Sequence, residues 1–144
     1  MECPYCSLTK SDQKVVFRDD LVWFVRDRRY QGALKHSGVI IPIAHRLSPF
    51  DFTAEEWAAT HELLVKAKAA QDERLAPDGY TLIWNCGSEL GQPPPHAHLH
   101  VIPRFDDEPL ADQGGRSAIK VPENRRPEPF RRGSGRAQSF GPPG

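Results

Sequence analysis

Three histidines alternate with apolar residues in the segment His96-Ala97-His98-Leu99-His100-Val101-Ile102. In a β-strand, side chains two residues apart point to the same face of the sheet. An extended chain here would therefore place the three imidazoles on one face and the apolar side chains against a core on the other. Because a buried imidazole needs polar partners, three of them in a row are costly as packing alone. The segment predicts a strand whose polar face has a chemical role.

Three interpretations of this histidine row are open. A solvent-facing stripe is the first, although such stripes are usually built from Lys, Glu and Thr. A catalytic metal site is the second, since histidines at i and i+2 can ligate zinc together; however, no Asp or Glu between Glu89 and Asp106 completes such a site. The third is a nucleophile for phosphorus, because neutral imidazole attacks phosphorus and a protonated neighbour stabilises phosphate oxygens. Amides in the preceding loop, at Asn85, Gly91 and Gln92, would then bind the phosphate.

The remaining pattern predicts an α+β domain. Strands are expected over residues 15–17, 21–25, 39–41, 80–84 and 96–102, the third ended by Pro42 and the last by Pro103. Thr53 and Glu56 have the spacing of a capping box, so a helix should follow Thr53 and end near Leu75. Its 3.6-residue period places Trp57 on the face toward the core. His61 lies in mid-helix, on the helix surface or at the edge of the core.

Composition excludes some classes of partner. The 144 residues include 19 basic and 19 acidic side chains, so the formal net charge is +0. We therefore expect no chain-wide attraction to nucleic acid or to an anionic membrane. No apolar run reaches the roughly 18 residues of a membrane helix. Since no export signal precedes the first strand either, we expect a cytoplasmic protein.

Proline and glycine become frequent after residue 106, and apolar residues become sparse. A segment of that composition buries too little apolar surface to fold as a core of its own. We expect a folded domain that carries the histidines over residues 1–106. We also expect an extended arm over residues 107–144, whose end from residue 131 is disordered.

A CxxC pair opens the chain at Cys3 and Cys6. The spacing is that of one half of a tetrahedral zinc site, and two further ligands are then needed. A reduced pair without a ligand and a redox pair are the alternatives. The redox interpretation lacks the helix that should begin at such a pair, because Pro4 and the polar stretch over residues 7–14 do not predict one.

Four separate elements of this sequence resemble the histidine triad superfamily of nucleotide hydrolases and transferases. They are Cys3-Pro4-Tyr5-Cys6, Val39-Ile40-Ile41-Pro42-x-x-His45, Gly91-Gln92, and His96-x-His98-x-His100-Val101-Ile102-Pro103-Arg104. Their order and rough spacing agree over residues 3–105. The resemblance implies the HIT-like α+β fold, which has a five-stranded antiparallel sheet and one long helix. It also implies a homodimer across which the sheet continues.

The resemblance assigns roles to individual residues. His98 would attack the α-phosphorus of a nucleotide and form a covalent nucleotidyl-histidine, which water or another acceptor resolves to release a nucleoside monophosphate. His96 and His100 would complete the catalytic set. The residues that would bind the nucleotide are Asn85 and Gln92 at the phosphate, Asp27 at the ribose and His100 at the phosphoryl oxygens.

The same resemblance extends to the cysteines. His45 and His96 would complete a closed Cys2His2 set with Cys3 and Cys6. Such a set would hold one structural zinc ion per chain, would fix the N-terminal segment to the sheet, and would orient His96 beside the nucleophile. No organic cofactor is implied.

Two positions depart from the family pattern. Pro93 stands where many members carry Ser or Thr, and it removes a hydroxyl and an amide donor near the leaving group, which puts a preference for phosphoramidates in doubt. Ser37 stands where many members have a histidine, and His36 lies one residue early. A one-residue slip turns a strand side chain to the other face unless a bulge restores it. His36 is therefore either a neighbour of the active site or a surface residue.

The leaving group is not specified by these motifs. Dinucleoside polyphosphates, nucleoside phosphoramidates and nucleotidylated small molecules are all candidate substrates. A nucleotidyl transferase or phosphorylase is the alternative with the same chemistry and another acceptor. A nucleotide-binding or partner-binding module with little catalysis is the alternative from a different class.

Overall fold

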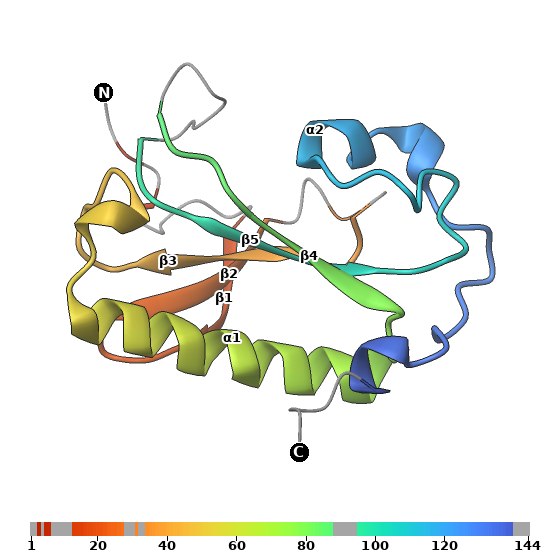
Figure 1. Ribbon diagram of the computed structural model, residues 1–144, viewed down its shortest axis with the longest axis horizontal. Coiled ribbons are helices and arrows are strands. Elements are labelled where there is room, and N and C mark those ends of the chain that lie inside the picture. The colour runs from red at the N-terminus through yellow and green to blue at the C-terminus, as the bar shows by residue number, and fades with distance from the viewer. Residues whose placement is uncertain are drawn as a thin grey trace.

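The structure, a computed structural model, describes residues 3, 5–6, 13–27, 31, 34–87 and 95–139. Its centre is a five-stranded antiparallel sheet in the order β1-β2-β3-β5-β4 (Figure 1). The strands are β1 (Gln13–Arg18), β2 (Val22–Asp27), β3 (Gly38–Pro42), β4 (Gly79–Trp84) and β5 (Leu99–Arg104). One long helix, α1 (Ala54–Leu75), crosses one face of the sheet. This confirms the predicted fold class.

The start of α1 is set by the predicted capping box. Thr53 Oγ1 accepts a hydrogen bond from the Glu56 amide at 3.1 Å, and Glu56 Oε1 accepts one from the Thr53 amide at 2.8 Å. Two amides that the first turn leaves without helical partners are thus satisfied. The helix ends at Ala76, which has a left-handed φ of +46°. Among the described residues, no helix is both long and apolar enough to cross a bilayer.

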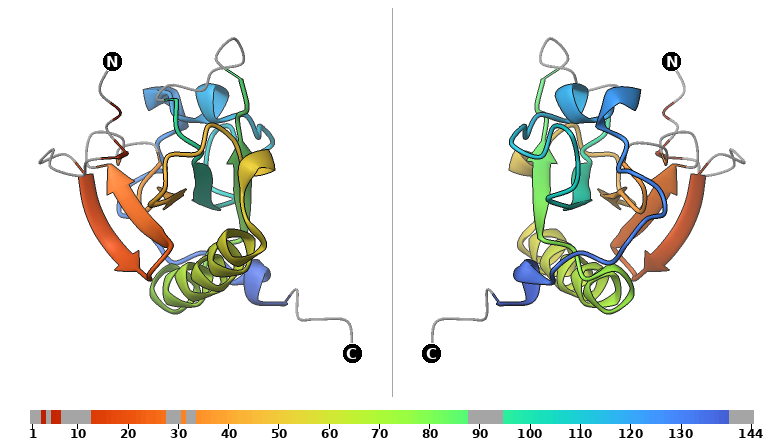
Figure 2. Two further views of the ribbon diagram at one scale, coloured as in Figure 1. Left: turned by 90° about the vertical axis from the view of Figure 1, so that its left-hand side faces the viewer. Right: turned by 90° about the vertical axis from the view of Figure 1, so that its right-hand side faces the viewer.

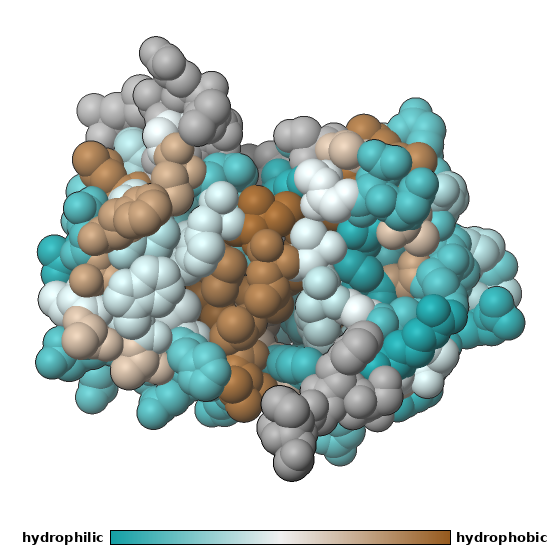
Figure 3. Space-filling view, viewed as in Figure 1, coloured by the Kyte–Doolittle hydropathy of each residue, from teal (hydrophilic) through white to brown (hydrophobic). Residues whose placement is uncertain are grey.

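The main core lies between α1 and the sheet. Its buried members are Val22, Phe24, Ile40, Ala59, Leu63, Ala67, Leu99 and Val101. The prediction that Trp57 belongs to this core is wrong, because its side chain is 46% exposed. The buried stripe of α1 is centred near Leu63 and Ala67, and Trp57 lies about 90° round the helix from it. Val65 on α1 and Leu82 on β4 are exposed as well. Figure 3 shows an apolar strip that runs down the middle of this face of the molecule.

β5 begins later and ends later than the sequence predicted. Its pairing with β4 runs from Leu99 to Arg104, so residues 96–98 precede the strand. Pro103 does not end it. The Arg104 carbonyl accepts a hydrogen bond from the β4 side, so the nitrogen of Pro103 faces the β3 side, where pairing has already ended at Val101. The missing N–H of Pro103 therefore costs no hydrogen bond of the sheet.

Residues 107–139, which we call the C-terminal strap, fold back on the domain (Figure 2). The expectation of an extended arm does not hold for this part of the chain. The short elements outside the sheet and α1 are η2 (Pro49–Asp51), α2 (Arg116–Ile119), η4 (Pro122–Asn124) and η5 (Arg136–Ser139). α2 covers the face of the sheet opposite α1, and the strap then runs to the C-terminal end of α1. A Cβ at Gly133 would lie 2.3 Å from the Ala76 carbonyl oxygen, so this close approach requires glycine.

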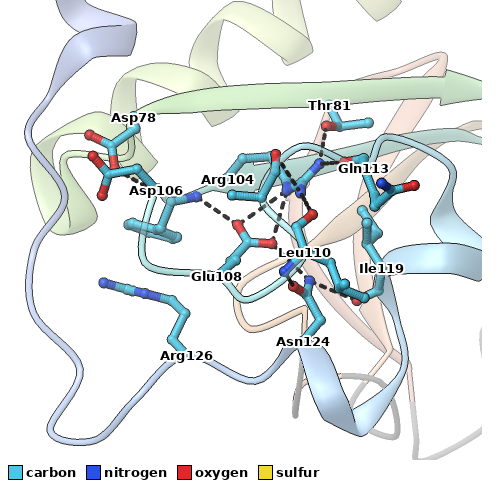
Figure 4. A network of polar contacts seen from close by, with 12 residues as sticks. Asp78, Thr81, Arg104, Asp106, Glu108, Leu110, Gln113, Ile119, Asn124 and Arg126 are labelled. Carbon is cyan, nitrogen blue, oxygen red and sulfur yellow. Dashed lines mark hydrogen bonds and ion pairs between the residues drawn. The ribbon is translucent and has the colours of Figure 1, made fainter.

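A buried polar network anchors the strap (Figure 4). Arg104 Nε donates to both carboxylate oxygens of Glu108, at 3.0 and 3.1 Å. Asn124 Nδ2 donates to Glu108 Oε1 at 2.8 Å and to the Ile119 carbonyl at 2.9 Å. Ile119 also joins a second small core with Ile102 of β5. Removing one partner of such a buried ion pair costs about 3–5 kcal/mol, so the network holds α2 firmly against the sheet.

Candidate active site and metal centre

The four predicted metal ligands lie together, where the chain leaves β3 and enters β5. One donor atom from each of Cys3, Cys6, His45 and His96 lies within 4.8 Å of the others. His45 Nδ1 is 3.1 Å from Cys6 Sγ and 3.2 Å from His96 Nδ1, and Cys3 Sγ is 3.4 Å from His96 Nδ1. Donors placed tetrahedrally about 2.0–2.3 Å from one zinc ion stand about 3.3–3.8 Å apart. The set therefore fits a single metal ion.

Backbone contacts hold two of these ligands in place. The Ala97 amide donates to the Arg46 carbonyl at 2.7 Å, which ties the segment before β5 to the loop after β3. His96 Nε2 lies 2.8 Å from the Pro42 carbonyl. Because a carbonyl only accepts, the proton of His96 sits on Nε2, and Nδ1 keeps a lone pair toward the cysteines. Burial lowers the pKa of His96, although this hydrogen bond acts in the opposite direction. The lowered pKa favours the neutral imidazole, which is the form that binds metals.

The Cys6 thiol of the cluster is also affected by its surroundings. Burial and then the neighbouring Cys3 raise the pKa of the Cys6 thiol. A metal cation supplies the positive charge that stabilises thiolates in such a setting. The four residues could therefore hold a metal ion.

His98 is buried, at 3% exposed, and its tautomer is also set by the backbone. Its Nδ1 lies 2.9 Å from the His96 carbonyl oxygen, so Nδ1 carries the proton and Nε2 is the unprotonated nitrogen. Burial lowers the pKa of His98, this hydrogen bond opposes the change, and Arg116 lowers the pKa further. The result is a neutral imidazole near pH 7 with a basic Nε2, the form in which histidine acts as a nucleophile.

His100 lies against His98, with ring centroids 4.8 Å apart. It lines a small cavity of about 50 Å³ together with Ser37, Gly38 and Arg116. Burial is the main cause that lowers the pKa of His100 to about 3, followed by His98, Arg116 and Lys120. Arg116 of α2 lines this cavity and Lys120 directly follows α2. Their positive charges favour an anion such as a phosphate in the cavity.

The structure describes some of the predicted nucleotide-binding residues but not others. Asn85 follows the last residue of β4, Trp84, which pairs with Leu99, the residue after His98. Asp27 is the last residue of β2, and its side chain lies outside what the structure describes. Gln92 and Pro93 lie outside the described residues.

His36 does not join the histidine row. Ser37, its neighbour, lines the cavity beside His100, as the count along the sequence indicated. His36 has a left-handed φ of +68° and lines a different cavity. His61 is exposed on α1, which agrees with the interpretation as helix surface.

Sequence reasoning missed Arg116 and Tyr5. Arg116 reaches the histidines because Arg104 and Glu108 fix the strap on the sheet, and no local pattern around Arg116 indicates that docking. The Tyr5 ring lies 5.4 Å from the His98 ring, centroid to centroid. Tyr5 lies between the two predicted zinc ligands of the CxxC pair. Because His96 is also a predicted ligand, the proposed metal site could have indicated that Tyr5 lies near the histidines.

Known proteins of one family resemble this chain in sequence and in structure. The HIT domain family matches residues 9–107. Purine nucleoside phosphoramidase from Escherichia coli (strain K12) is 36% identical over 92 residues, which are 61% of this chain and 73% of that protein. A HIT family protein from Bacillus anthracis has a TM-score of 0.68 at 27% identity, covering 78% of this chain and 79% of that one. A HIT family member from Bacillus subtilis has a TM-score of 0.67 at 25% identity, covering 86% and 89%.

We expect the free energy of unfolding to fall from pH 7 to pH 5, and His100→Gln to reduce that fall. The pKa of His100 is about 3 in the folded chain, whereas an unfolded histidine has a pKa near 6.5. Between these values the unfolded chain binds a proton that the folded chain does not, so acid favours unfolding. His100 contributes about 2 kcal/mol over this interval.

Urea unfolding at both pH values measures the effect. His61→Gln, on the exposed side of α1, is the control and should keep the parental pH dependence. The same pH dependence in His100→Gln as in the parent would show that this imidazole ionises freely in the folded chain.

Proposed function

Because this chain belongs to the HIT domain family, we propose that it hydrolyses a nucleoside 5′-phosphoryl bond through His98 and releases a nucleoside monophosphate. The observation that carries the proposal is the hydrogen bond from His98 Nδ1 to the His96 carbonyl, at 2.9 Å. It leaves Nε2 of a buried, neutral imidazole as the nucleophilic atom. The likeness to a purine nucleoside phosphoramidase supports the general class of reaction.

The reaction has two displacement steps. In the first, Nε2 of His98 forms a bond to the α-phosphorus, and the bond to the leaving group breaks with its electron pair going to the leaving group. In the second, the oxygen of water bonds to phosphorus and one proton of that water is released. The nitrogen–phosphorus bond breaks, and its electron pair returns to Nε2. Dividing the displacement through a covalent histidine makes each step easier.

Stabilisation of the phosphoryl oxygens comes from groups around His98. His100 lies beside its ring, and Arg116 lines the same cavity as His100 and brings a positive charge. A fixed cation in a site with little water stabilises developing negative charge more strongly than it would in solvent. The family resemblance adds three contacts to this proposal, which are Asn85 and Gln92 at the phosphate and Asp27 at the ribose.

The leaving group is proposed to be a phosphate rather than an amine. An amine must be protonated as it leaves, and Pro93 supplies neither a hydroxyl nor an amide N–H at the position where many family members carry Ser or Thr. A phosphate leaves as a stable anion and needs less help. This favours phosphoanhydrides, such as dinucleoside polyphosphates, over phosphoramidates.

The covalent step is tested with a dinucleoside polyphosphate. We expect His98→Ala to lower kcat by roughly 10³-fold or more, because the nucleophile is removed, while the nucleotide still binds. Acid quenching of the parent enzyme during turnover should trap a nucleotidyl adduct, which intact-mass analysis detects and peptide mapping assigns to His98.

His61→Ala is the matched control and should keep the parental rate. If His98→Ala kept the kcat of the parent enzyme, His98 would not be the nucleophile. Adding inorganic phosphate separates hydrolysis from phosphorolysis, because a phosphorylase would produce a nucleoside diphosphate.

We further propose that the metal centre holds one structural zinc ion. Two thiolates and two imidazoles in a tetrahedral arrangement suit zinc, and a closed set of four protein ligands leaves no open position for substrate. The ligand His96 also supplies the carbonyl that binds His98 Nδ1. The ion would therefore orient the nucleophile indirectly, by fixing His96.

Elemental analysis of the purified protein should find about one zinc per chain. We expect Cys6→Ser to lose the zinc and to lower Tm by roughly 10 °C or more, because the binding energy of a structural ion is part of the folding energy. Cys86→Ser removes a cysteine outside the cluster and should keep both the zinc and Tm. Equal zinc content in the two variants would contradict the proposed ligand set.

The edge of the sheet at β4 is proposed as the homodimer interface. In the described sheet, β4 pairs with β5 on one side only. The adjoining surface exposes Trp57, Val65 and Leu82, at 46%, 53% and 49%. An unpaired strand edge beside an apolar strip favours a second copy that continues the sheet around a two-fold axis.

We expect Leu82→Lys to convert the dimer to a monomer, because it places a charge in the apolar strip. Sedimentation equilibrium measures the mass of the assembly. Leu21→Lys makes the same change at an exposed leucine between β1 and β2, and should stay dimeric. A parent protein that sediments as a monomer at all concentrations would rule the interface out.

A further inference from the structure

A second and larger cavity lies beyond the end of β5, while the histidine row lies at its start. Its volume is about 230 Å³. Four parts of the chain form its walls: the turn before β3, the C-terminal end of α1, the end of β5 and the C-terminal strap. The lining includes Lys35, His36, Arg74, Leu75, Phe105 and Phe130. None of the residues assigned above to the triad site or to the metal centre lines it.

The walls of this cavity are strongly cationic. Its cationic residues are Lys35, Arg74, Arg126, Arg131 and Arg132. Glu108 is the acidic residue of the lining, and both of its oxygens already accept hydrogen bonds from Arg104. Within the described part of the chain, Arg126 is paired with Asp107, whereas no carboxylate forms an ion pair with the other four cations.

A neighbouring hollow adds to this positive charge. It has a volume of about 40 Å³, shares His36, Arg74 and Leu75 with the large cavity, and is also lined by Arg26. The Nε of Arg26 is buried and has no hydrogen-bond partner among the described residues. A buried guanidinium nitrogen without a partner is costly, so an anion close to it would be stabilising.

The backbone holds His36 in a strained conformation beside these cations. Its φ is +68°, and two glutamines fix it: the His36 amide donates to Gln31 Oε1 at 2.7 Å, and Gln71 Nε2 donates to the His36 carbonyl at 2.7 Å. Strain of this kind persists where the surrounding structure enforces it, often at binding sites. Burial is the main cause that lowers the pKa of His36 to about 4, and the positive charges of Arg26, Arg74 and Lys35 lower it further.

We propose that this cavity binds a small organic phosphate, at a site separate from the triad. The phosphate lies among Lys35, Arg74 and Arg131, whose ammonium and guanidinium groups donate to its oxygens. The organic part lies against Leu75 and Phe130. Cations from three segments of the chain converge on a cavity of small-molecule size, which suits a compact dianion. Binding connects the strap to α1 and therefore stabilises the folded chain.

Ribose 5-phosphate is the probe, with calorimetric titration and Tm as the measurements. We expect it to bind the full chain and to raise Tm, and ribose without phosphate to do neither. Inorganic phosphate should bind more weakly, since it lacks the organic part. No binding of ribose 5-phosphate, or equal binding of inorganic phosphate, would overturn the proposal of an organic phosphate.

Variants locate the site. Arg74→Gln and Lys35→Gln alter exposed residues and should each weaken binding about tenfold, as expected for the loss of one charge-assisted contact. Lys66→Gln makes the same charge change at an exposed position on α1 and should bind as the parent does, as should Arg116→Gln. Loss of binding in Arg116→Gln but not in Arg74→Gln would place the ligand at the triad and refute the second site. Because no nucleotide is used, the outcome does not depend on the proposed enzyme activity.

Discussion

His96 is the residue through which the metal centre, the sheet and the candidate nucleophile are connected. Its Nδ1 faces the cysteines, its Nε2 donates to the Pro42 carbonyl at 2.8 Å, and its own carbonyl accepts from His98 Nδ1 at 2.9 Å. The contact with Pro42 holds the ring of His96, and the contact with His98 holds its backbone carbonyl. The tautomer of His98 then follows, because the only proton that can meet a carbonyl is the one on Nδ1. A site built in this way depends on backbone geometry more than on the identity of neighbouring side chains.

Polar contacts position the C-terminal strap, and they explain how this one segment lines both the cavity at His100 and the larger cationic cavity. Apolar burial is not directional, whereas the Arg104–Glu108 pair and the bonds of Asn124 have defined geometry. They hold α2 with Arg116 beside the histidines on the face of the sheet opposite α1. Beyond Asn124 the strap turns to the C-terminal end of α1 and forms one wall of the cationic cavity. The polar network therefore positions both α2 beside the histidines and the strap wall of the cationic cavity.

The features that could be predicted from the sequence are those set by neighbouring residues. Thr53 and Glu56 interact three residues apart, so the start of α1 could be predicted from the sequence. The cysteine and histidine motifs likewise indicated which four residues lie together as possible metal ligands. Trp57 was misplaced because the buried stripe of a helix is decided by what the helix packs on, and its edge cannot be located from periodicity alone. The strap was missed for the same reason, since its docking depends on contacts between residues that are distant in the sequence, such as Ile119 with Ile102 and Arg132 with the Glu73 carbonyl.

A net charge of +0 conceals how the charges are distributed. The acidic side chains of the strap and its surroundings are largely used in internal pairs, as in Arg104–Glu108 and Arg126–Asp107. Basic side chains line the two cavities, including Arg116 beside His100. Net charge decides whether a whole chain is attracted to a polyanion, whereas the local potential in a cavity decides whether a small anion binds there. The balance that argues against nucleic acid as a partner is therefore compatible with local sites for small anions.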